Sequence, residues 1–198
     1  MENTESVDSQ QNGNFSLADW LKHLTTLRKG RDSDAIRHAA SLAQVTGTSQ
    51  ATPHGESCFH HGRVIAENLA ELGLDDESII AGLLFAVVHY AQVSLEDVEE
   101  QFGTGVCKLI KGTEQMDAIH ISHGRLMESA LFTSSIDNLR KMLLAMVDDV
   151  RVVLIKLVER LAVLRNIAIL GDRERRRVAR ETMDIYAPLA NRLGVGQI

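Results

Sequence analysis

Residues 76–90 read DESIIAGLLFAVVHY, and apolar side chains stand on most sides of this segment when it is wound as a helix. A helix that is apolar all round is buried, because no face of it suits water. The segment therefore predicts a central helix inside a helical core. No run of the sequence approaches the roughly 20 apolar residues that a membrane-spanning helix needs, so we expect no membrane contact.

Helical spacing of apolar residues continues on both sides of this segment. It covers residues 17–27, where Ser16 is placed to cap the helix, and residues 64–72, which Gly73 follows. Further helices are predicted over residues 94–103, 105–116, 136–146 and 150–164 and from Asp172 onward, with Pro188 kinking or ending the last one. Loops are predicted at 47–57 and 118–133. With two prolines and eight aromatic residues, the chain lacks the turn and strand signals of a β protein. The predicted fold class is all-α.

Length and composition indicate one ordinary globular domain. The 198 residues are 44% hydrophobic and 24% charged, and the formal net charge is −6. An acidic chain is a poor candidate for direct nucleic-acid binding. The polar, acidic start has no secretory signal, and two cysteines make no disulfide framework, so we expect a cytoplasmic protein. We predict a disordered tail at 1–14 and a folded domain at 15–190. The apolar, glycine-containing residues 191–198 are expected to lead into a further domain of a longer protein.

Three histidines lie beside a cysteine in the loop that precedes the second helix. His54, His60 and His61 flank Cys58, but their spacing matches no closed Cys/His zinc pattern and no second pair follows. A polar loop with one or two hydrogen-bonded histidines is favoured over a zinc site.

Other charged and polar side chains give weaker signals. His120 and His123 fall in a predicted loop, where solvent exposure is favoured over metal binding. The arginines of residues 173–180 have the charge to hold a phosphate, but they alternate with Glu174 and Glu181. Because Glu–Arg pairs at three and four residues are routine on a helix, a solvated or interdomain face is favoured.

Glu159 stands in an apolar helix, three residues after Lys156. An intrahelical Lys156–Glu159 pair is the simplest interpretation. A metal or nucleotide site at the centre of the helical bundle is the alternative.

Two stretches of the second half resemble the RelA/SpoT family of (p)ppGpp synthetases and hydrolases. They are residues 156–161, KLVERL, preceded by 140–146, RKMLLAM, and residues 181–194, ETMDIYAPLANRLG. The resemblance covers about residue 55 to the end, which is the family's N-terminal hydrolase domain of the HD type. It implies a helical bundle that holds a manganese ion and removes the 3′-pyrophosphate of the alarmone. It also implies a separate synthetase domain after this segment, which transfers pyrophosphate from ATP to GDP or GTP.

The resemblance also implies where the active-site residues would stand. Active members use a histidine from a His-Pro pair, a His-Asp doublet, a Glu-Asp pair, a closing aspartate and a guanine-binding arginine. In this sequence those positions fall, in that order, on His61, Phe85 and Ala86, His89 and Tyr90, Glu159, and Thr52. His61 is followed by Gly62 instead of the usual proline. Phe85 and Ala86 carry no donor atom, so we expect manganese binding to be lost, with His61 a remnant ligand.

We therefore expect no cofactor and no catalytic residue in this chain, which would be the inactive hydrolase domain of a RelA-type GTP pyrophosphokinase. Its expected partner is the synthetase domain of the same parent protein, which it would regulate. The candidate contact surfaces are Trp20, the arginine-rich helix and residues 186–198.

Two alternatives stay open from the sequence. One is an active hydrolase with a displaced His61–His89–Glu159 metal site, since His89 lies one helical turn after Phe85. The other is a sensor that binds guanine nucleotides without cleaving them. The sequence does not establish whether the chain forms a homo-oligomer.

Overall fold

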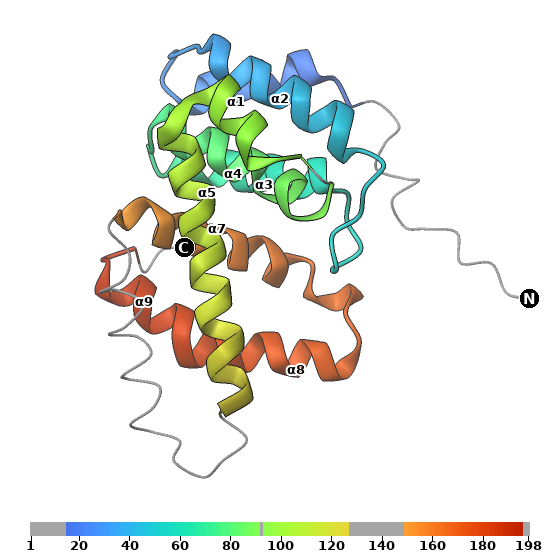
Figure 1. Ribbon diagram of the computed structural model, residues 1–198, viewed down its shortest axis with the longest axis vertical. Helices are drawn as coiled ribbons and strands as arrows, with labels where there is room; N and C mark the ends of the chain where they lie inside the picture. Colours follow the sequence, from blue (N-terminus) through green and yellow to red (C-terminus); the bar gives the residue numbers. More distant parts are fainter. Residues whose placement is uncertain (1–14, 92, 127–148, 196–198) are drawn as a thin grey trace, which may run out of the picture.

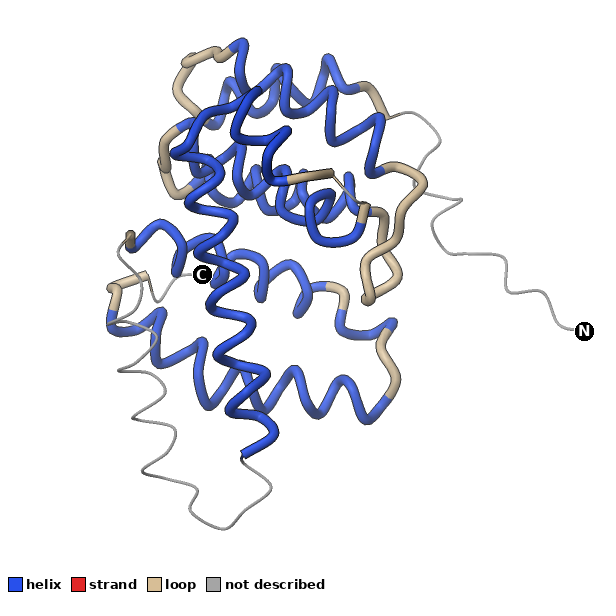
Figure 2. Tube along the Cα trace, in the orientation of Figure 1, coloured by secondary structure: helices blue, strands red, loops and turns tan. Residues whose placement is uncertain are grey.

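The computed structural model describes residues 15–91, 93–126 and 149–195, with the backbone alone for 118–126. Within these ranges every regular element is a helix, and one isolated bridge joins Ala51 to Ser57 (Figure 1, Figure 2). The elements are α1 (Leu17–Leu27), α2 (Asp34–Gly47), α3 (Cys58–Glu71), α4 (Asp76–Tyr90), α5 (Leu95–Leu126), α7 (Val150–Arg165), η2 (Ile167–Ile169), α8 (Asp172–Glu181), η3 (Thr182–Tyr186) and α9 (Ala187–Arg192). The predicted all-α fold is confirmed.

The central helix of the fold is α4, as its all-round apolar sequence predicts. It packs against α2, α3, α5 and α7, and all of its residues from Ser78 to Val87 are buried. Figure 1 shows α1 and α2 on one side of α3 and α4, with α8 and α9 at the opposite end of the molecule. The long α5 runs from one end to the other and contacts both α4 and α7. None of the helices in the described ranges is both long and apolar enough to cross a lipid bilayer.

Most predicted helix boundaries agree with the structure because their capping residues act as expected. The Ser16 hydroxyl accepts a hydrogen bond from the Asp19 amide at 3.2 Å and starts α1. Gly73 follows the end of α3 with φ of +77°, which a glycine adopts without strain. Gly103, with φ of +87°, breaks α5 near the predicted end of the 94–103 helix.

Several predictions about secondary structure need correction or cannot be placed. The loop predicted at 118–133 is wrong over 118–126, because α5 continues to Leu126 and no proline interrupts it. Helix α2 was not predicted, although Ser33 caps it. The predicted tail at 1–14, the predicted helix at 136–146 and residues 196–198 lie outside the described residues.

Pro188 does not end the last helix. A π-helical turn, Thr182–Tyr186, comes directly before it, and Pro188 then lies in the first turn of α9, which continues to Arg192. Proline removes one backbone donor and its ring crowds the carbonyl four residues earlier. The wider π turn is the local change that accommodates this crowding.

Glycines allow α3 and α4 to approach closely beside His61. A Cβ atom added to Gly62 would lie 2.2 Å from the Leu83 carbonyl oxygen, and one added to Gly82 would lie 2.5 Å from the Leu69 side chain. A proline at position 62 would therefore collide with α4. The close approach brings the first turn of α3 against the middle of α4.

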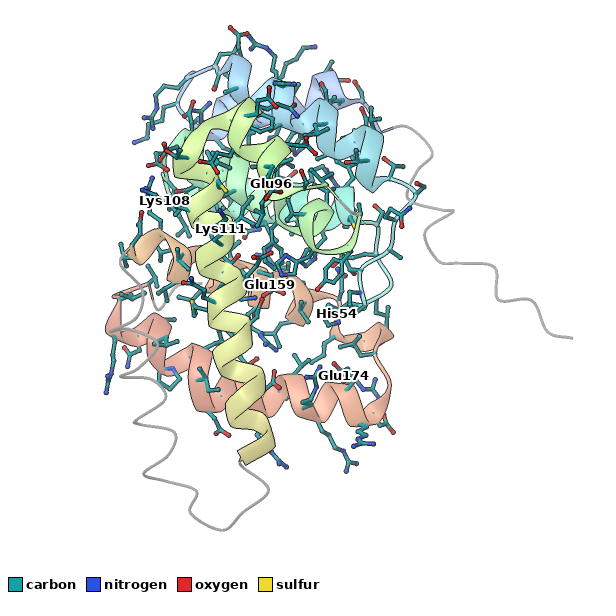
Figure 3. The ribbon with its side chains drawn as sticks, viewed as in Figure 1. His54, Glu96, Lys108, Lys111, Glu159 and Glu174 are labelled. Atoms are coloured by element: carbon teal, nitrogen blue, oxygen red, sulfur yellow. The ribbon has the colours of Figure 1, made fainter. Side chains whose placement is uncertain are left out.

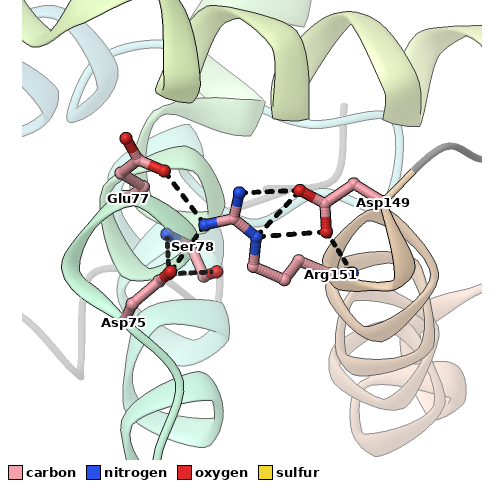
Figure 4. A network of polar contacts seen from close by, with 5 residues as sticks. All are labelled: Asp75, Glu77, Ser78, Asp149 and Arg151. Carbon is pink, nitrogen blue, oxygen red and sulfur yellow. Dashed lines mark hydrogen bonds and ion pairs between the residues drawn. The ribbon is translucent and has the colours of Figure 1, made fainter.

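Arg151 joins the N-terminal ends of α4 and α7 (Figure 4). Its guanidinium lies 2.5 Å from the Asp75 carboxylate, 2.9 Å from that of Glu77 and 2.6 Å from that of Asp149. Asp75 and Asp149 are also the N-cap residues of α4 and α7. The hydrogen bonds from Arg151 to Asp149 lower the pKa of that carboxyl below its usual value. One cation thus fixes the position of α7 relative to α4.

Candidate functional site

The four α4 positions that the family resemblance identifies face the core or its edge. Phe85 is 2% exposed and Ala86 is fully buried, so both belong to the apolar core. The His89 ring stacks on the Phe85 ring with centroids 4.5 Å apart. Tyr90, at the end of α4, is partly exposed. In the middle of α4, where the resemblance implies a histidine and an aspartate, the chain presents a phenyl ring and a methyl group.

Helix α7 faces Phe85 with a charged pair. The Lys156 ammonium lies 3.0 Å from a Glu159 carboxylate oxygen, which confirms the predicted intrahelical pair. The same ammonium lies 2.7 Å from the Asp117 carboxylate of α5 and 5.1 Å from the centroid of the Phe85 ring. Figure 3 shows Glu159 near the centre of the molecule, where α5 crosses α7.

Neighbouring side chains set the ionisation of Glu159. Burial alone would raise the pKa of this carboxyl, but Lys156, His61 and Arg160 together lower it from 4.5 to about 2. Burial alone would likewise lower the pKa of Lys156, but Glu159, Tyr186 and Asp117 raise it above its usual value. Both groups are therefore ionised at neutral pH.

His61 lies in the first turn of α3 and is engaged by a carboxylate. It is 2% exposed, and its Nδ1–H donates to Glu56 Oε1 at 2.6 Å. The other Glu56 oxygen accepts a hydrogen bond from the Asn166 side chain at 3.0 Å, just after α7. This chain of hydrogen bonds ties the start of α3 to the end of α7.

The loop before α3 holds Thr52, where the resemblance implies a guanine-binding arginine. Thr52 is 5% exposed, and its hydroxyl accepts a hydrogen bond from the His54 amide at 3.3 Å. It presents no positive charge to a nucleotide. Burial lowers the pKa of the half-buried His54, and its Nδ1 has no hydrogen-bond partner among the described residues.

Cys58 is fully buried in the core, and burial raises the pKa of its thiol. A thiol in that state is a poor nucleophile and a poor metal ligand. Cys58, His54, His60 and His61 do not converge on one point, since no group of three or more potential ligands forms within the described ranges.

The donor atoms present do not fit a manganese ion. Of the four positions matched to the family's metal ligands, His61 and Glu159 carry a donor suited to the ion, and they are engaged by Glu56 and Lys156 respectively. Within the residues described here, no three His, Cys, Asp or Glu side chains converge as ligands. The displaced His61–His89–Glu159 site is therefore not assembled: His89 instead stacks on Phe85, 3.9 Å from a Glu114 oxygen.

The arginine-rich helix α8 forms ion pairs along its own length, as predicted. Arg175 pairs with Asp172, and Arg177 pairs with Glu174 and with Glu181. The favoured interpretation of this stretch as a charged face is confirmed for these pairs. The side chains of His120 and His123 lie outside the described residues, although their backbone is helical.

Trp20 does not provide the contact surface expected of it. Its side chain is buried at 5% exposure, and the indole N–H donates to Glu67 Oε1 at 2.5 Å. Tyr186 is also a core residue at 5% exposure. Local sequence pattern does not show burial of this kind, because it depends on which helices meet.

Asp117 and Glu56 are the site residues that sequence reasoning missed. Asp117 lies on the same helix as Leu109 and Ile110. The side of α5 on which it stands therefore follows once the helix is known to extend beyond Met116. Glu56 immediately precedes Ser57, the N-cap of α3. The spacing between Glu56 and His61 in the sequence does not predict that their side chains are in contact.

A model of the HD domain family matches residues 18–196 of this chain. The chain is 37% identical over 165 residues to the guanosine-3′,5′-bis(diphosphate) 3′-pyrophosphohydrolase of Vibrio cholerae, covering 83% of this chain and 22% of that protein. It is 36% identical over 163 residues to the bifunctional (p)ppGpp synthase/hydrolase SpoT of Escherichia coli, covering 82% of this chain and 22% of that protein.

A third relative covers almost the whole chain. It is the GTP pyrophosphokinase of Photobacterium angustum, 35% identical over 196 residues, which are 96% of this chain and 25% of that protein. A solved structure described as a metazoan ortholog of SpoT that hydrolyzes ppGpp has a TM-score of 0.57 at 18% identity. That match covers 83% of this chain and 98% of the other, and it supports the fold alone. The chain thus spans between 22% and 25% of the length of these sequence relatives.

Proposed function

The chain belongs to the HD domain family, and from that premise we propose that it is a RelA/SpoT-type hydrolase domain that no longer hydrolyses (p)ppGpp. In this proposal it is part of a cytoplasmic GTP pyrophosphokinase. Its role there is to regulate the synthetase domain of the same parent protein.

The observation that carries the proposal is the burial of Phe85 and Ala86 in the apolar core. Family members that cleave (p)ppGpp rely on an imidazole and a carboxylate at these positions. A divalent cation acidifies the attacking water and polarises the phosphate only when enough ligands hold it. With these ligands replaced by carbon, the site has lost the group that activates water.

Losses at three further positions support the same proposal. His89 and Tyr90 stand where active members carry a carboxylate pair, so the two carboxylates that would transfer protons are missing. Thr52 stands where they carry a guanine-binding arginine.

The exposed side of α8 is the candidate surface toward the synthetase domain. Arg173, Arg176 and Arg180 are exposed there and recur at three and four residues, so they share one face of the helix. Met183 continues that face in the π-helical turn and is 71% exposed. Regulation through this surface requires contacts that differ between two states of the synthetase domain.

The proposal is tested by assaying the purified chain for manganese-dependent release of pyrophosphate from (p)ppGpp. We expect no release above the rate without protein. Turnover that requires manganese and is abolished by His61→Ala would overturn the proposal.

An active hydrolase is the second candidate, and the identity to the Vibrio cholerae and Escherichia coli proteins favours it. The same assay separates the two candidates, because only an active hydrolase releases pyrophosphate. Calorimetry with (p)ppGpp, GDP and GTP adds a further distinction: micromolar binding without turnover would indicate a nucleotide sensor.

A further inference from the structure

Arg160 of α7 contacts both ends of the π-helical turn. Its Nη2 atom lies 3.1 Å from Oε2 of Glu181, the residue just before the turn. Its Cζ atom lies 4.4 Å from the ring centroid of Tyr186, the last residue of the turn. The side chains of Arg160 and Glu181 are 13% and 18% exposed, and Tyr186 is 5% exposed. One largely buried cation therefore bridges the two ends of the turn.

The π-helical turn attaches α8 and α9 to the rest of the domain. Both helices pack mainly on this turn, and apart from them the main partner of the turn is α7. Val178 is the buried residue of α8 and Leu189 that of α9. Figure 1 shows α8 and α9 together at one end of the molecule. The placement of both helices therefore depends on how the turn is held against α7.

The contacts of Arg160 join the two stretches that carry the family resemblance. Arg160 lies in residues 156–161, and both of its partners lie in residues 181–194. The α4 positions matched to metal ligands carry Phe85 and Ala86 instead. The chain thus matches the family where α7 holds the turn and departs from it where α4 would hold an ion. This difference indicates a role for the Arg160 contacts that does not depend on hydrolysis.

A π-helical turn contains one residue more than the α-helical turn that would replace it. Such turns are rare, occur singly inside α-helices and are frequent at functional sites. Because each residue of an α-helix adds a rotation of about 100°, loss of the extra residue would turn α9 by that angle relative to α8. A guanidinium that stacks on a ring and pairs with a half-buried carboxylate contributes more than an exposed ion pair. Arg160 is therefore well placed to keep the turn in its observed form.

We propose that Arg160 is a positioning residue, which holds the π-helical turn against α7 and so fixes the directions of α8 and α9. The inference rests on the function proposed above and deepens it, because α8 carries the candidate surface toward the synthetase domain, with Arg173, Arg176 and Arg180. Arg160 sets where this surface stands relative to the rest of the domain. It is thus the connection through which the domain acts on the synthetase domain.

The first test measures amide hydrogen exchange of the 198-residue chain by mass spectrometry. We expect Arg160→Met to speed exchange at least about tenfold in peptides from residues 182–193, and to leave peptides from α2 and α4 unchanged. Arg165→Met is the matched control, because Arg165 lies on the same helix and bonds to Asn68 of α3 at 3.2 Å. It is expected to leave residues 182–193 unchanged. Exchange that is unaltered by Arg160→Met, or faster throughout the chain, would overturn the proposal.

Deletion of Met183 tests whether Arg160 acts through the turn. Met183 is 71% exposed, so its removal takes little from the core, but it shortens the turn and rotates Tyr186 by about 100° away from Arg160. We expect the deletion to speed exchange of the same peptides about tenfold, and Arg160→Met to add less than about twofold to it. Fully additive effects would overturn the proposal. If Arg160→Met does not fold, Tyr186→Leu replaces it and is judged by the same two outcomes.

The second test measures synthetase activity in the parent protein. We expect Arg160→Met to change the synthetase rate at least about fivefold, Arg160→Lys to change it less because the pair with Glu181 is kept, and Arg165→Met to leave it unchanged. If removal of the whole hydrolase domain alters this rate and Arg160→Met does not, the role of Arg160 is overturned and the regulatory function stands. Release of pyrophosphate from (p)ppGpp by the wild-type chain would instead overturn the loss of hydrolysis and leave the exchange result intact.

Discussion

At Ala86, a methyl group occupies a fully buried position that the family resemblance assigns to an aspartate, which has consequences for attempts to restore the site. We expect the double variant Phe85→His/Ala86→Asp to release no pyrophosphate from (p)ppGpp in the presence of manganese. Positions 89, 90 and 159 still lack the family's groups, and a carboxylate at position 86 enters the core without a partner. The measurement is the same release assay used for the wild type.

The stability of this double variant provides its control. Loss of the Phe85 contact with Lys156 and burial of a new charge are expected to lower Tm, while circular dichroism at low temperature shows whether the helices remain. A folded double variant with a measurable, manganese-dependent rate would contradict the prediction. It would also show that the remaining side chains are sufficient for catalysis.

The lowered pKa of Glu159 predicts that the stability of the folded chain depends on pH in the acid range. Its pKa is lowered from 4.5 to about 2 in the folded chain, so the folded state binds this proton less readily than the unfolded state. The resulting stabilisation is complete above pH about 5 and is lost as pH falls toward 2. We expect the difference in unfolding free energy between wild type and Glu159→Gln to shrink by about 3 kcal/mol over this range.

Urea unfolding of both proteins at a series of pH values measures this difference. Asp19→Asn is the comparison, because Asp19 lies in an exposed pair with Lys22 whose net effect on stability is small. A wild-type minus Glu159→Gln difference that stays constant between pH 5 and 2 would contradict the assignment.

At the scale of helices, the contact of α3 with α4 depends on Gly62. A Cβ at this position would lie 2.2 Å from the Leu83 carbonyl oxygen, which is backbone and does not move aside easily. We expect Gly62→Ala to lower the unfolding free energy by about 3 kcal/mol, because α3 must shift away from α4. Gly171→Ala is the control, since a Cβ there meets no atom within 4 Å. Equal stability of the two variants would show that α3 and α4 adapt.

Arg151 is expected to stabilise the ends of two helices at once. Replacing it with methionine leaves Asp75, Glu77 and Asp149 close together without a cation, while their side chains remain 36% to 52% exposed. We expect Arg151→Met to cost about 2 kcal/mol in urea unfolding and to regain part of this in high salt, which screens repulsion between carboxylates.

Arg175→Met, which breaks one exposed pair with Asp172 within α8, serves as the comparison. It is expected to change the unfolding free energy by less than about 0.5 kcal/mol. A cost for Arg151→Met that is as small, or that grows with salt, would contradict the role assigned to this guanidinium.

Helices with polar caps and large apolar side chains were predictable, whereas others were not. Ser16, Gly73 and Asp149 gave correct boundaries because capping depends on neighbouring residues. Helix α2 was missed although Ser33 precedes it, because its buried face consists largely of alanines instead of large apolar residues. The extension of α5 to Leu126 had no strong signal, since polar residues and a glycine occupy this stretch.

Some features of the candidate site were likewise predictable from the sequence and others were not. The Lys156–Glu159 pair follows from spacing on one helix, and the family resemblance identified Phe85 and Ala86. The contact of Lys156 with Asp117 and that of His61 with Glu56 depend on how separate segments meet. Trp20 shows why burial between helices is hard to predict from sequence. A lone tryptophan on a terminal helix was predicted to contact another domain, yet it is buried against α3.

For the whole molecule, a continuous apolar core connects the two ends of the fold. The core cluster includes Trp20 of α1, Phe85 of α4, Val158 of α7 and Leu189 of α9. Figure 1 shows that α1 and α9 lie at opposite ends, with α4, α5 and α7 between them. Because no polar layer separates the ends completely, the described part of the chain is expected to unfold as one cooperative unit.

Trp20, the single tryptophan of the chain, provides the measurement. It reports unfolding at the α1 end, whereas far-UV circular dichroism reports all helices together. We expect both signals to give the same urea midpoint within error. We also expect Arg151→Met to shift both equally, because it weakens α7 against α4, on which α2 packs. If fluorescence and circular dichroism gave separate midpoints, the two ends would be independent units, and the contacts of Arg151 and Lys156 between helices would not transmit stability across the domain.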